Sequence, residues 1–511
     1  MRYPVKSFLF FFLINLLCYL ELEAQQSQID KARREELKVK RTDQWDTWYK
    51  AKHKKDSIQA ASQKEREDFL QSSLHMEYQE SVRLKDSARY AGYRIMLDTL
   101  DAETRTLKLV NGNYTSFPLQ IFILKDLDTL NLGSNDIAYL DMKFSNFSHL
   151  KFLNISGNKL NERTIKFDRN DSLFYLNLSE NNFNKIPGSL RKLKGLKTLR
   201  ISGNAKRGKS LKIKIYRWDS LKVLDLSKNN LKRIPRGLKK LKNLEELNLS
   251  YNDIKTLKGL HRLDQIKELE ISFNPLFLDP KYLVNLPNLE NLMIRGCGIT
   301  YLPPEINRLS GLKKLVVPEN RLVDVPREIG DFKYLENLML YKNQLKDLPE
   351  ELYNLSSLVW LDVYYNDLKY ISPKISKLQN LEILYLSYNK LRELPESLGE
   401  MTKLRELYLH HNQLRGLPES ISGLNNLKYL HVYDNHLTVF PHGVLELKKL
   451  EELNLSGNLI EYFPMEIAGY EHLKYIYLDN NNTDKNSNSY EYFKWALKQL
   501  QDKGVMIKFD Y

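Results

Sequence analysis

The sequence predicts an α/β solenoid, a stack of short repeats that each add one strand to a continuous parallel sheet. The pattern L-x-x-L-x-L-x-x-N-x-L recurs across residues 104–484, mostly every 23 residues, and such a period is typical of stacked repeats. A hydrophobic content of 42% and a charged content of 28% argue against disorder and against a multispan membrane protein. Outside the N-terminal apolar run the only cysteine is Cys297, so we expect stacking rather than disulfides to stabilise the fold.

The N-terminus has the features of a signal peptide, which we assign to residues 1–24. An apolar run at 8–20 follows Arg2 and Lys6 and precedes Ala24, the pattern of a positive segment, an apolar segment and a cleavage site. The 13 residues of this run fall short of the roughly 20 that span a bilayer as a helix. We therefore expect export to the periplasm, the cell surface or the medium. A cytoplasmic location is the alternative if the signal is not used.

Residues 25–103 lack the repeat and are rich in charged residues and glutamine. Apolar residues such as Trp45, Trp48, Leu74 and Tyr78 recur three or four positions apart, which predicts amphipathic helices. We expect a helical N-terminal cap, and the alternative is a separate oligomerisation or partner-binding segment.

The repeat itself has a mechanical explanation. In the rung at Leu384-Tyr385-Leu386, alternation along a strand directs the two leucines to one face and Tyr385 to the other. Asn389 follows where the chain turns, and its amide can satisfy backbone groups of its own turn and of the neighbouring rung. Counting a degenerate rung near residue 112, about 17 rungs are expected, with these ladder positions: Asn135, Asn158, Asn181, Asn204, Asn229, Asn252, Asn274, Cys297, Asn320, Asn343, Asn366, Asn389, Asn412, Asn435, Asn458 and Asn481.

A second recurring feature is a proline pair after the ladder residue, which limits the return segment to a short helix. It occurs as Ile186-Pro187, Ile234-Pro235, Leu302-Pro303, Val325-Pro326, Leu348-Pro349, Leu394-Pro395, Leu417-Pro418 and Phe463-Pro464. With this pair the array resembles the 23-residue class of the leucine-rich repeat superfamily. The resemblance implies a horseshoe with a concave parallel sheet and protein recognition as the commonest role. Because it lacks cysteine-rich caps, the chain resembles bacterial exported members of the superfamily.

The C-terminal residues, 485–511, predict a cap. A helix over 490–504, ended by Gly504, precedes a last strand over 505–511. Such a cap would cover the leucines and the sheet edge of the last rung.

Concave positions are those six, four, two and one residues before each ladder Asn, where side chains are not needed for stacking. From the Asn343 rung to the Asn435 rung they are unusually aromatic, and we expect an exposed surface that anchors a partner, since Tyr and Trp supply large contact areas. The alternative is that these rings only stabilise the sheet. The predicted partner-binding residues are Tyr341, Trp360, Tyr364, Tyr365, Tyr385, Tyr388, Tyr408, His410, Tyr429, His431 and Tyr433.

The histidines of this surface do not predict a metal site. His410 and His431 fall at non-equivalent depths of neighbouring rungs, and His411 points away from both. A tetrahedral site would need a further ligand such as Asp434. We expect no metal and no cofactor.

A basic segment lies between residues 185 and 242, where 20 Lys or Arg residues face only Asp219 and Asp225. The field of such a segment attracts anionic polysaccharide, lipid headgroups or nucleic acid, and for an exported protein the first two are favoured. A well-solvated flank without a ligand is the alternative. The predicted anion-binding residues are Arg191, Lys192, Lys194, Lys239, Lys240 and Lys242.

Residues 203–210 match the phosphate-binding pattern G-x-x-x-x-G-K-S. That chemistry requires a helix whose first amides hold phosphate, whereas residues 210–219 alternate as an extended segment. We therefore predict a non-enzymatic scaffold that binds a protein through the concave face of the C-terminal repeats. The alternatives are an envelope-associated binder of anionic glycan or lipid, and a cytoplasmic signalling scaffold.

Overall fold

The computed structural model describes residues 103–140, 143–205, 208–260, 263–278, 282 and 286–510. They belong to one compact unit, Tyr90–Tyr511. The predicted signal peptide and all but the last residue of the predicted N-terminal cap lie outside these residues, so both stay predictions.

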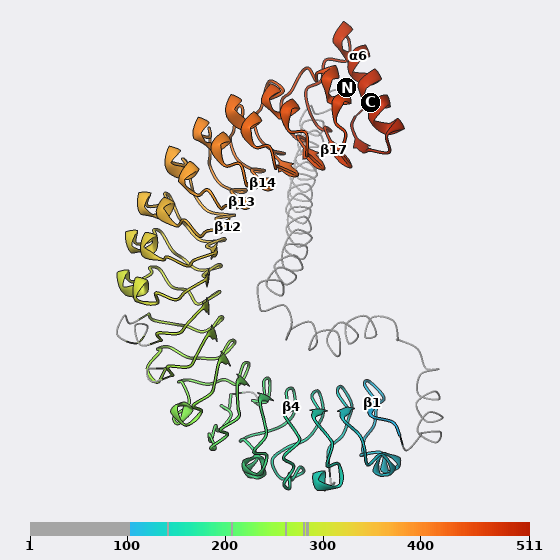
Figure 1. The fold of residues 1–511 in the computed structure, drawn as a ribbon, viewed down its shortest axis with the longest axis vertical. Helices are drawn as coiled ribbons and strands as arrows, with labels where there is room; N and C mark the ends of the chain where they lie inside the picture. The colour runs from blue at the N-terminus through green and yellow to red at the C-terminus, as the bar shows by residue number, and fades with distance from the viewer. Residues whose placement is uncertain are drawn as a thin grey trace, which may run out of the picture. The chain divides into compact units, whose positions relative to one another are not determined.

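Within this part of the chain, 18 short strands form one parallel sheet, as the sequence predicts. Each strand pairs with the next in chain order, and the strands line the inner side of a curved stack (Figure 1). The strands are β1 (Thr106–Lys108), β2 (Thr129–Asn131), β3 (Phe152–Asn154), β4 (Tyr175–Asn177), β5 (Thr198–Arg200), β6 (Val223–Asp225), β7 (Glu246–Asn248), β8 (Glu268–Glu270), β9 (Asn291–Met293), β10 (Lys314–Val316), β11 (Asn337–Met339), β12 (Trp360–Asp362), β13 (Ile383–Tyr385), β14 (Glu406–Tyr408), β15 (Tyr429–His431), β16 (Glu452–Asn454), β17 (Tyr475–Tyr477) and β18 (Met506–Lys508).

The core is a continuous row of leucines between the sheet and the outer segments. Leu384 pairs in register with Leu361 on one side and Leu407 on the other. All three side chains are fully buried. No single rung could bury them alone, so the stacking itself provides the hydrophobic core.

The ladder asparagines bridge adjacent rungs. The Asn389 amide nitrogen donates to the carbonyls of Leu386 (2.9 Å) and of Val363 in the preceding rung (3.0 Å). Its oxygen accepts the backbone N–H of Leu368 at 3.0 Å. The same bonds recur at Asn343, Asn366, Asn412 and Asn435.

Cys297 occupies one ladder position and lacks the amide. Its sulfur lies 3.5 Å from the carbonyl oxygens of Ile271 and Arg295. Burial raises the pKa of its thiol to about 11, so it stays protonated as a weak donor.

The outer side of the stack consists of turns and short 3₁₀ helices, many of which begin just after a proline. Pro395, for example, is the N-cap of η9. The 3₁₀ helices are η1 (Leu119–Ile123), η2 (Phe144–Asn146), η3 (Gly188–Lys192), η4 (Leu238–Lys240), η5 (Pro304–Arg308), η6 (Arg327–Asp331), η7 (Glu350–Asn354), η8 (Pro373–Lys377), η9 (Glu396–Glu400), η10 (Glu419–Gly423), η11 (His442–Glu446) and η12 (Met465–Gly469).

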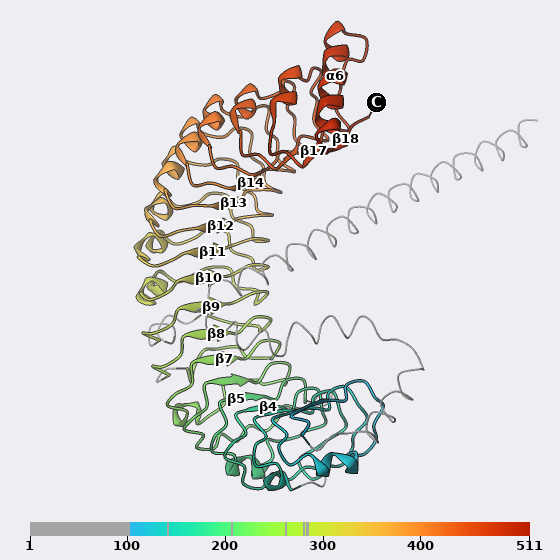
Figure 2. The ribbon, with the colours of Figure 1, turned by 45° about the vertical axis from the view of Figure 1, so that its right-hand side comes forward.

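The C-terminal end is covered by helix α6 (Asn488–Asp502) and strand β18, which confirms the predicted helix-plus-strand cap (Figure 2). Helix α6 packs on η12 and buries Phe493 and Leu497. Strand β18 pairs with β17, so the backbone N–H and C=O groups on that edge of β17 form hydrogen bonds. The helix begins two residues earlier than the sequence predicts.

Candidate binding surfaces

Five consecutive strands, β11 to β15, and the turns after them bring the eleven predicted partner-binding residues together on the concave side. The strands pair without a register shift, so equivalent positions lie side by side. Asp362 pairs with Tyr385, Tyr385 with Tyr408, and Tyr408 with His431. We call this set of eleven residues the aromatic face.

The central row of the aromatic face is a stack of rings. Tyr385 and Tyr408 lie parallel, with ring centroids 4.3 Å apart and planes 2° apart. Trp360 contacts Tyr385 at 6.1 Å, and His431 meets Tyr408 edge-on at 4.8 Å. In a second row His410 stacks on Tyr433 at 4.3 Å. The stacked and edge-to-face contacts among them are of the kind that aromatic pairs prefer.

A third row runs along the turn that precedes each ladder Asn. Tyr365, Tyr388 and His411 all adopt a left-handed backbone, with φ of 54–55°. Tyr365 stacks on Tyr388 at 5.7 Å and Tyr388 contacts His411 at 4.0 Å. Left-handed backbone is uncommon for bulky residues, so the ladder bonds of every rung impose this geometry on whichever side chain is present.

The expectation that the whole aromatic face is exposed is wrong. Tyr365 is 49% exposed, but Trp360, Tyr385 and His410 are buried. Tyr341, Tyr364 and Tyr408 are also buried, whereas Tyr388, Tyr429, His431 and Tyr433 are half-buried. The alternation of side chains along a strand determines the face of the sheet on which a ring lies. It does not determine how that ring is oriented on the face or how much of it is exposed. Rings in register cover one another's faces, which accounts for part of the burial.

Carboxylates accompany the rings, and the sequence analysis did not single them out as site residues. Glu406 accepts the Tyr408 hydroxyl at 3.1 Å. Glu452 lies 3.1 Å from His431 Nε2, and Asp434 lies 3.2 Å from His411 Nε2. The same four concave offsets that located the aromatic residues also contain these acids, so a survey of charge at those offsets would have found them.

Burial governs the protonation of the inner groups. It raises the pKa of the Tyr385 and Tyr408 phenols and of the Asp362 carboxyl well above their usual values. Burial, together with repulsion from His431 and His411, lowers the pKa of His410 well below its usual value. The inner rings are therefore neutral at pH 7.

The geometry around the histidines suits hydrogen bonding. His410 Nδ1 lies 2.9 Å from the Ser387 hydroxyl, and the rings of His410 and His431 are 6.4 Å apart. Within the described ranges, no group of three or more His, Cys, Asp or Glu residues is arranged to hold a metal ion.

The predicted anion-binding residues lie on a different surface. Arg191 and Lys192 end η3, Lys239 and Lys240 end η4, and Lys194 and Lys242 follow in the next turns. All six are exposed. We call the exposed Lys and Arg residues of 185–242 the basic band.

The phosphate-binding pattern has the wrong surroundings. It follows β5, but residues 208–217 contain no helix. Lys212, just beyond the pattern, instead forms an isolated parallel bridge with Lys185. The amides that would cradle a phosphate are therefore missing from the described part of this segment.

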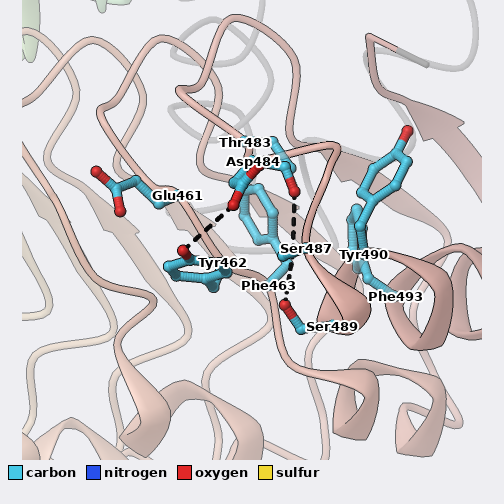
Figure 3. Close-up of a pocket in the computed structure, with 9 residues that line it drawn as sticks. All are labelled: Glu461, Tyr462, Phe463, Thr483, Asp484, Ser487, Ser489, Tyr490 and Phe493. Carbon is cyan, nitrogen blue, oxygen red and sulfur yellow. Dashed lines mark hydrogen bonds between the residues drawn. The ribbon is translucent and has the colours of Figure 1, made fainter.

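An open hollow of about 490 Å³ is lined by residues that include Lys267, Glu290 and Tyr334. A smaller hollow lies where the cap meets the last rungs, near Phe493 (Figure 3). There Tyr462 donates to Asp484 at 3.4 Å and the Ser487 hydroxyl to the Asp484 carbonyl at 2.9 Å. The smaller hollow has no room for a water molecule.

None of the helices in the described residues combines the length and the apolar character needed to cross a bilayer.

Comparisons with known proteins agree with this architecture. A leucine-rich repeat region model matches residues 142–279, and a second leucine-rich repeat model matches 310–368, 365–414 and 425–482. Together they match more than half of the chain. No curated protein matches it.

Solved structures with this architecture come from bacteria and plants. A leucine-rich repeat protein of Leptospira interrogans is 28% identical with a TM-score of 0.65, over 84% of this chain and 99% of that one. A plant peptide hormone receptor, RGFR1 in complex with RGF2, is 24% identical with a TM-score of 0.53, over 75% and 64%. The PEPR1–AtPEP1 structure is 26% identical with a TM-score of 0.52, over 71% and 57%.

Proposed function

Because the chain belongs to the leucine-rich repeat superfamily, we propose that it is a non-enzymatic recognition scaffold that binds a protein partner through the aromatic face. Members of this superfamily are generally non-enzymatic binding scaffolds. Export, predicted from residues 1–24, belongs to the same proposal.

The observation that supports this surface most is the unbroken ring contact across consecutive rungs. Trp360, Tyr385, Tyr408 and His431 each touch the next ring along the stack. The coil does not need them, because the leucines and ladder asparagines already satisfy the core and the turns. Large aromatic side chains concentrated at one place are the residues that contribute most to protein interfaces.

Electrostatics favours a basic partner segment. Glu406, Asp434 and Glu452 lie among the rings, whereas the same offsets of these rungs contain few lysines or arginines, Lys342 being the exception. A partner that presents basic residues beside apolar ones would complement both features.

A pair of double variants tests the proposal. Tyr365→Ala/Tyr388→Ala removes two stacked rings of the aromatic face, of which Tyr365 is exposed and Tyr388 half-buried. Tyr251→Ala/Phe273→Ala removes the stacked pair at the equivalent turn positions of earlier repeats, whose ring centroids are 4.3 Å apart. Quantitative affinity capture from an extract of the source cells, followed by a binding isotherm with each captured protein, measures the effect.

We expect one captured partner to lose at least about 2 kcal/mol of binding free energy with the first variant and to bind the second as it binds wild type. Equal affinity for all three proteins would reject the aromatic face as the binding surface. Thermal unfolding of both variants separates this outcome from misfolding. If the first variant only unfolds earlier and binds normally, its rings serve sheet packing alone.

The anionic-ligand alternative concerns the basic band, which is a different surface and is compatible with this proposal.

A further inference from the structure

We propose that the basic band is a second binding surface, whose ligand is a linear acidic polysaccharide. It extends over the outer segments of three consecutive rungs, those of Asn181, Asn204 and Asn229. It is separate from the aromatic face, which begins at the Asn343 rung, five rungs after the Asn229 rung.

One row of the band repeats from rung to rung. Lys192, Arg217 and Lys240 each immediately precede a core residue, which is Leu193, Trp218 or Leu241, and all three core residues are buried. The three cations therefore occupy equivalent positions in successive rungs, and all are exposed. A repeat architecture converts this sequence period into a straight row of charge across the stack.

The charges at the edge of the sheet indicate that the repeat scaffold does not require a row of like charges. At the position just before each strand, many neighbouring rungs elsewhere pair opposite charges, although Arg405 and Lys428 are adjacent cations. Glu451 lies 2.6 Å from both Lys428 and Lys474. Within the band the corresponding neighbours are Lys197 and Lys222, joined only through a backbone bond of 2.8 Å. Like charges on adjacent strands are destabilising.

Most of the band's charge is not neutralised by the described residues. Among its described residues, only Arg217 and Lys222 pair with a carboxylate, at 3.5 Å to Asp219 and 3.0 Å to Glu245. The six predicted anion-binding residues form no ion pair within the described part of the chain. A surface with this field lowers its free energy by binding a polyanion and releasing counterions.

The surroundings of the band favour a polysaccharide over other polyanions. No large hydrophobic side chain is exposed among the described residues of 185–242, so an apolar anchor for a membrane surface is missing there. The described part of the band also lacks a long helix to enter a duplex groove, and its rings Tyr216 and Trp218 are not exposed platforms for bases. The row crosses successive rungs, so a linear acidic chain that lies along the stack can meet one cation per rung.

The test compares two triple variants of the full chain. Lys192→Gln/Arg217→Gln/Lys240→Gln removes the repeating row. Lys346→Gln/Lys369→Gln/Arg415→Gln removes the same charge from exposed positions of the C-terminal half. The probes are heparin and polygalacturonate, which distinguish sulfate from carboxylate, with neutral dextran, anionic phosphatidylglycerol vesicles and duplex DNA for comparison.

We expect wild type to bind at least one acidic polysaccharide and not dextran. The first variant should lose at least about tenfold in affinity at low salt. The slope of log Kd against log salt concentration should decrease by about three. The second variant should bind as wild type does. An equal loss in both variants would reduce the effect to net charge and overturn the proposal. So would tighter binding to vesicles or DNA than to either polysaccharide, or the absence of polysaccharide binding. Unchanged thermal unfolding of both variants ensures that a loss reports the surface.

Discussion

The outer sides of the basic band and of the C-terminal repeats differ at one equivalent position, the tenth residue after the ladder Asn. In the band this residue is Arg191 or Lys239, whereas in two C-terminal rungs it is Gly330 or Gly399. A Cβ on Gly399 would collide with the carbonyl oxygen of Ser420 in the next rung. The C-terminal 3₁₀ helices η9 and η10 pack closely, whereas residues 208–217, between η3 and η4, contain no helix. Long cations are therefore accommodated where the outer packing is open.

The largest effect on stability is expected when a long cationic side chain, such as those of the basic band, is introduced into the closely packed C-terminal repeats. Gly399→Arg forces η9 and η10 apart and should cost about 2–3 kcal/mol. Gly416→Arg is the control, because an added side chain there meets no atom within 4 Å, and it should change stability by less than about 0.5 kcal/mol. Urea midpoints measure both, and equal midpoints would show that the outer packing is not tight at Gly399.

Loss of a ladder asparagine should cost the same stability in the N-terminal and C-terminal halves of the repeat array. Asn181 and Asn389 both accept one backbone N–H at 3.0 Å, from Leu160 and Leu368. Alanine at either position leaves that N–H without a partner and removes one of the two ladder bonds that two carbonyls accept, at a cost of about 2 kcal/mol. Hydrogen exchange of the Leu160 and Leu368 amides should accelerate in the respective variants. A cost in only one half would mean that the two halves do not share the same scaffold.

The scaffold could be predicted closely because every rung repeats the same constraint. The leucine period and the ladder residue Asn389 specify strand, turn and core without reference to distant parts of the chain. The degenerate first rung and the cap were also identified, since β1 and α6 lie within two residues of their expected starts.

The surfaces could be predicted less well. Whether Tyr385 is exposed depends on how its ring lies against Tyr408, and the close approach at Gly399 depends on the next rung's carbonyl. Neither follows from the residue's own repeat position. The acids Glu406 and Glu452 were missed because the survey of concave positions concentrated on aromatic residues.

The smallest effect is expected at the sheet edge, where the two halves differ in charge order. Hydrogen bonds from Lys428 and Lys474 lower the pKa of the Glu451 carboxyl below its usual 4.5. Its contribution is therefore present above the unfolded-state pKa and is lost as the pH falls through the lowered folded-state pKa. Glu451→Gln should cost about 1 kcal/mol or less at pH 7 and nothing at pH 2, as measured by chemical unfolding. Lys197→Gln should cost nothing at either pH. A penalty for Glu451→Gln that persists at pH 2 would contradict this origin.

The two halves can be compared most directly by photo-crosslinking at Tyr365 and Tyr251. Both tyrosines precede a ladder Asn, both are 49% exposed, and their φ angles are 55° and 54°. Tyr365 belongs to the aromatic face and Tyr251 to the N-terminal repeats. A photoreactive phenylalanine at each position, irradiated in an extract of the source cells, is expected to give a discrete crosslinked protein from position 365 and none from position 251. The same product from both positions, or a product from 251 alone, would contradict partner binding through the aromatic face.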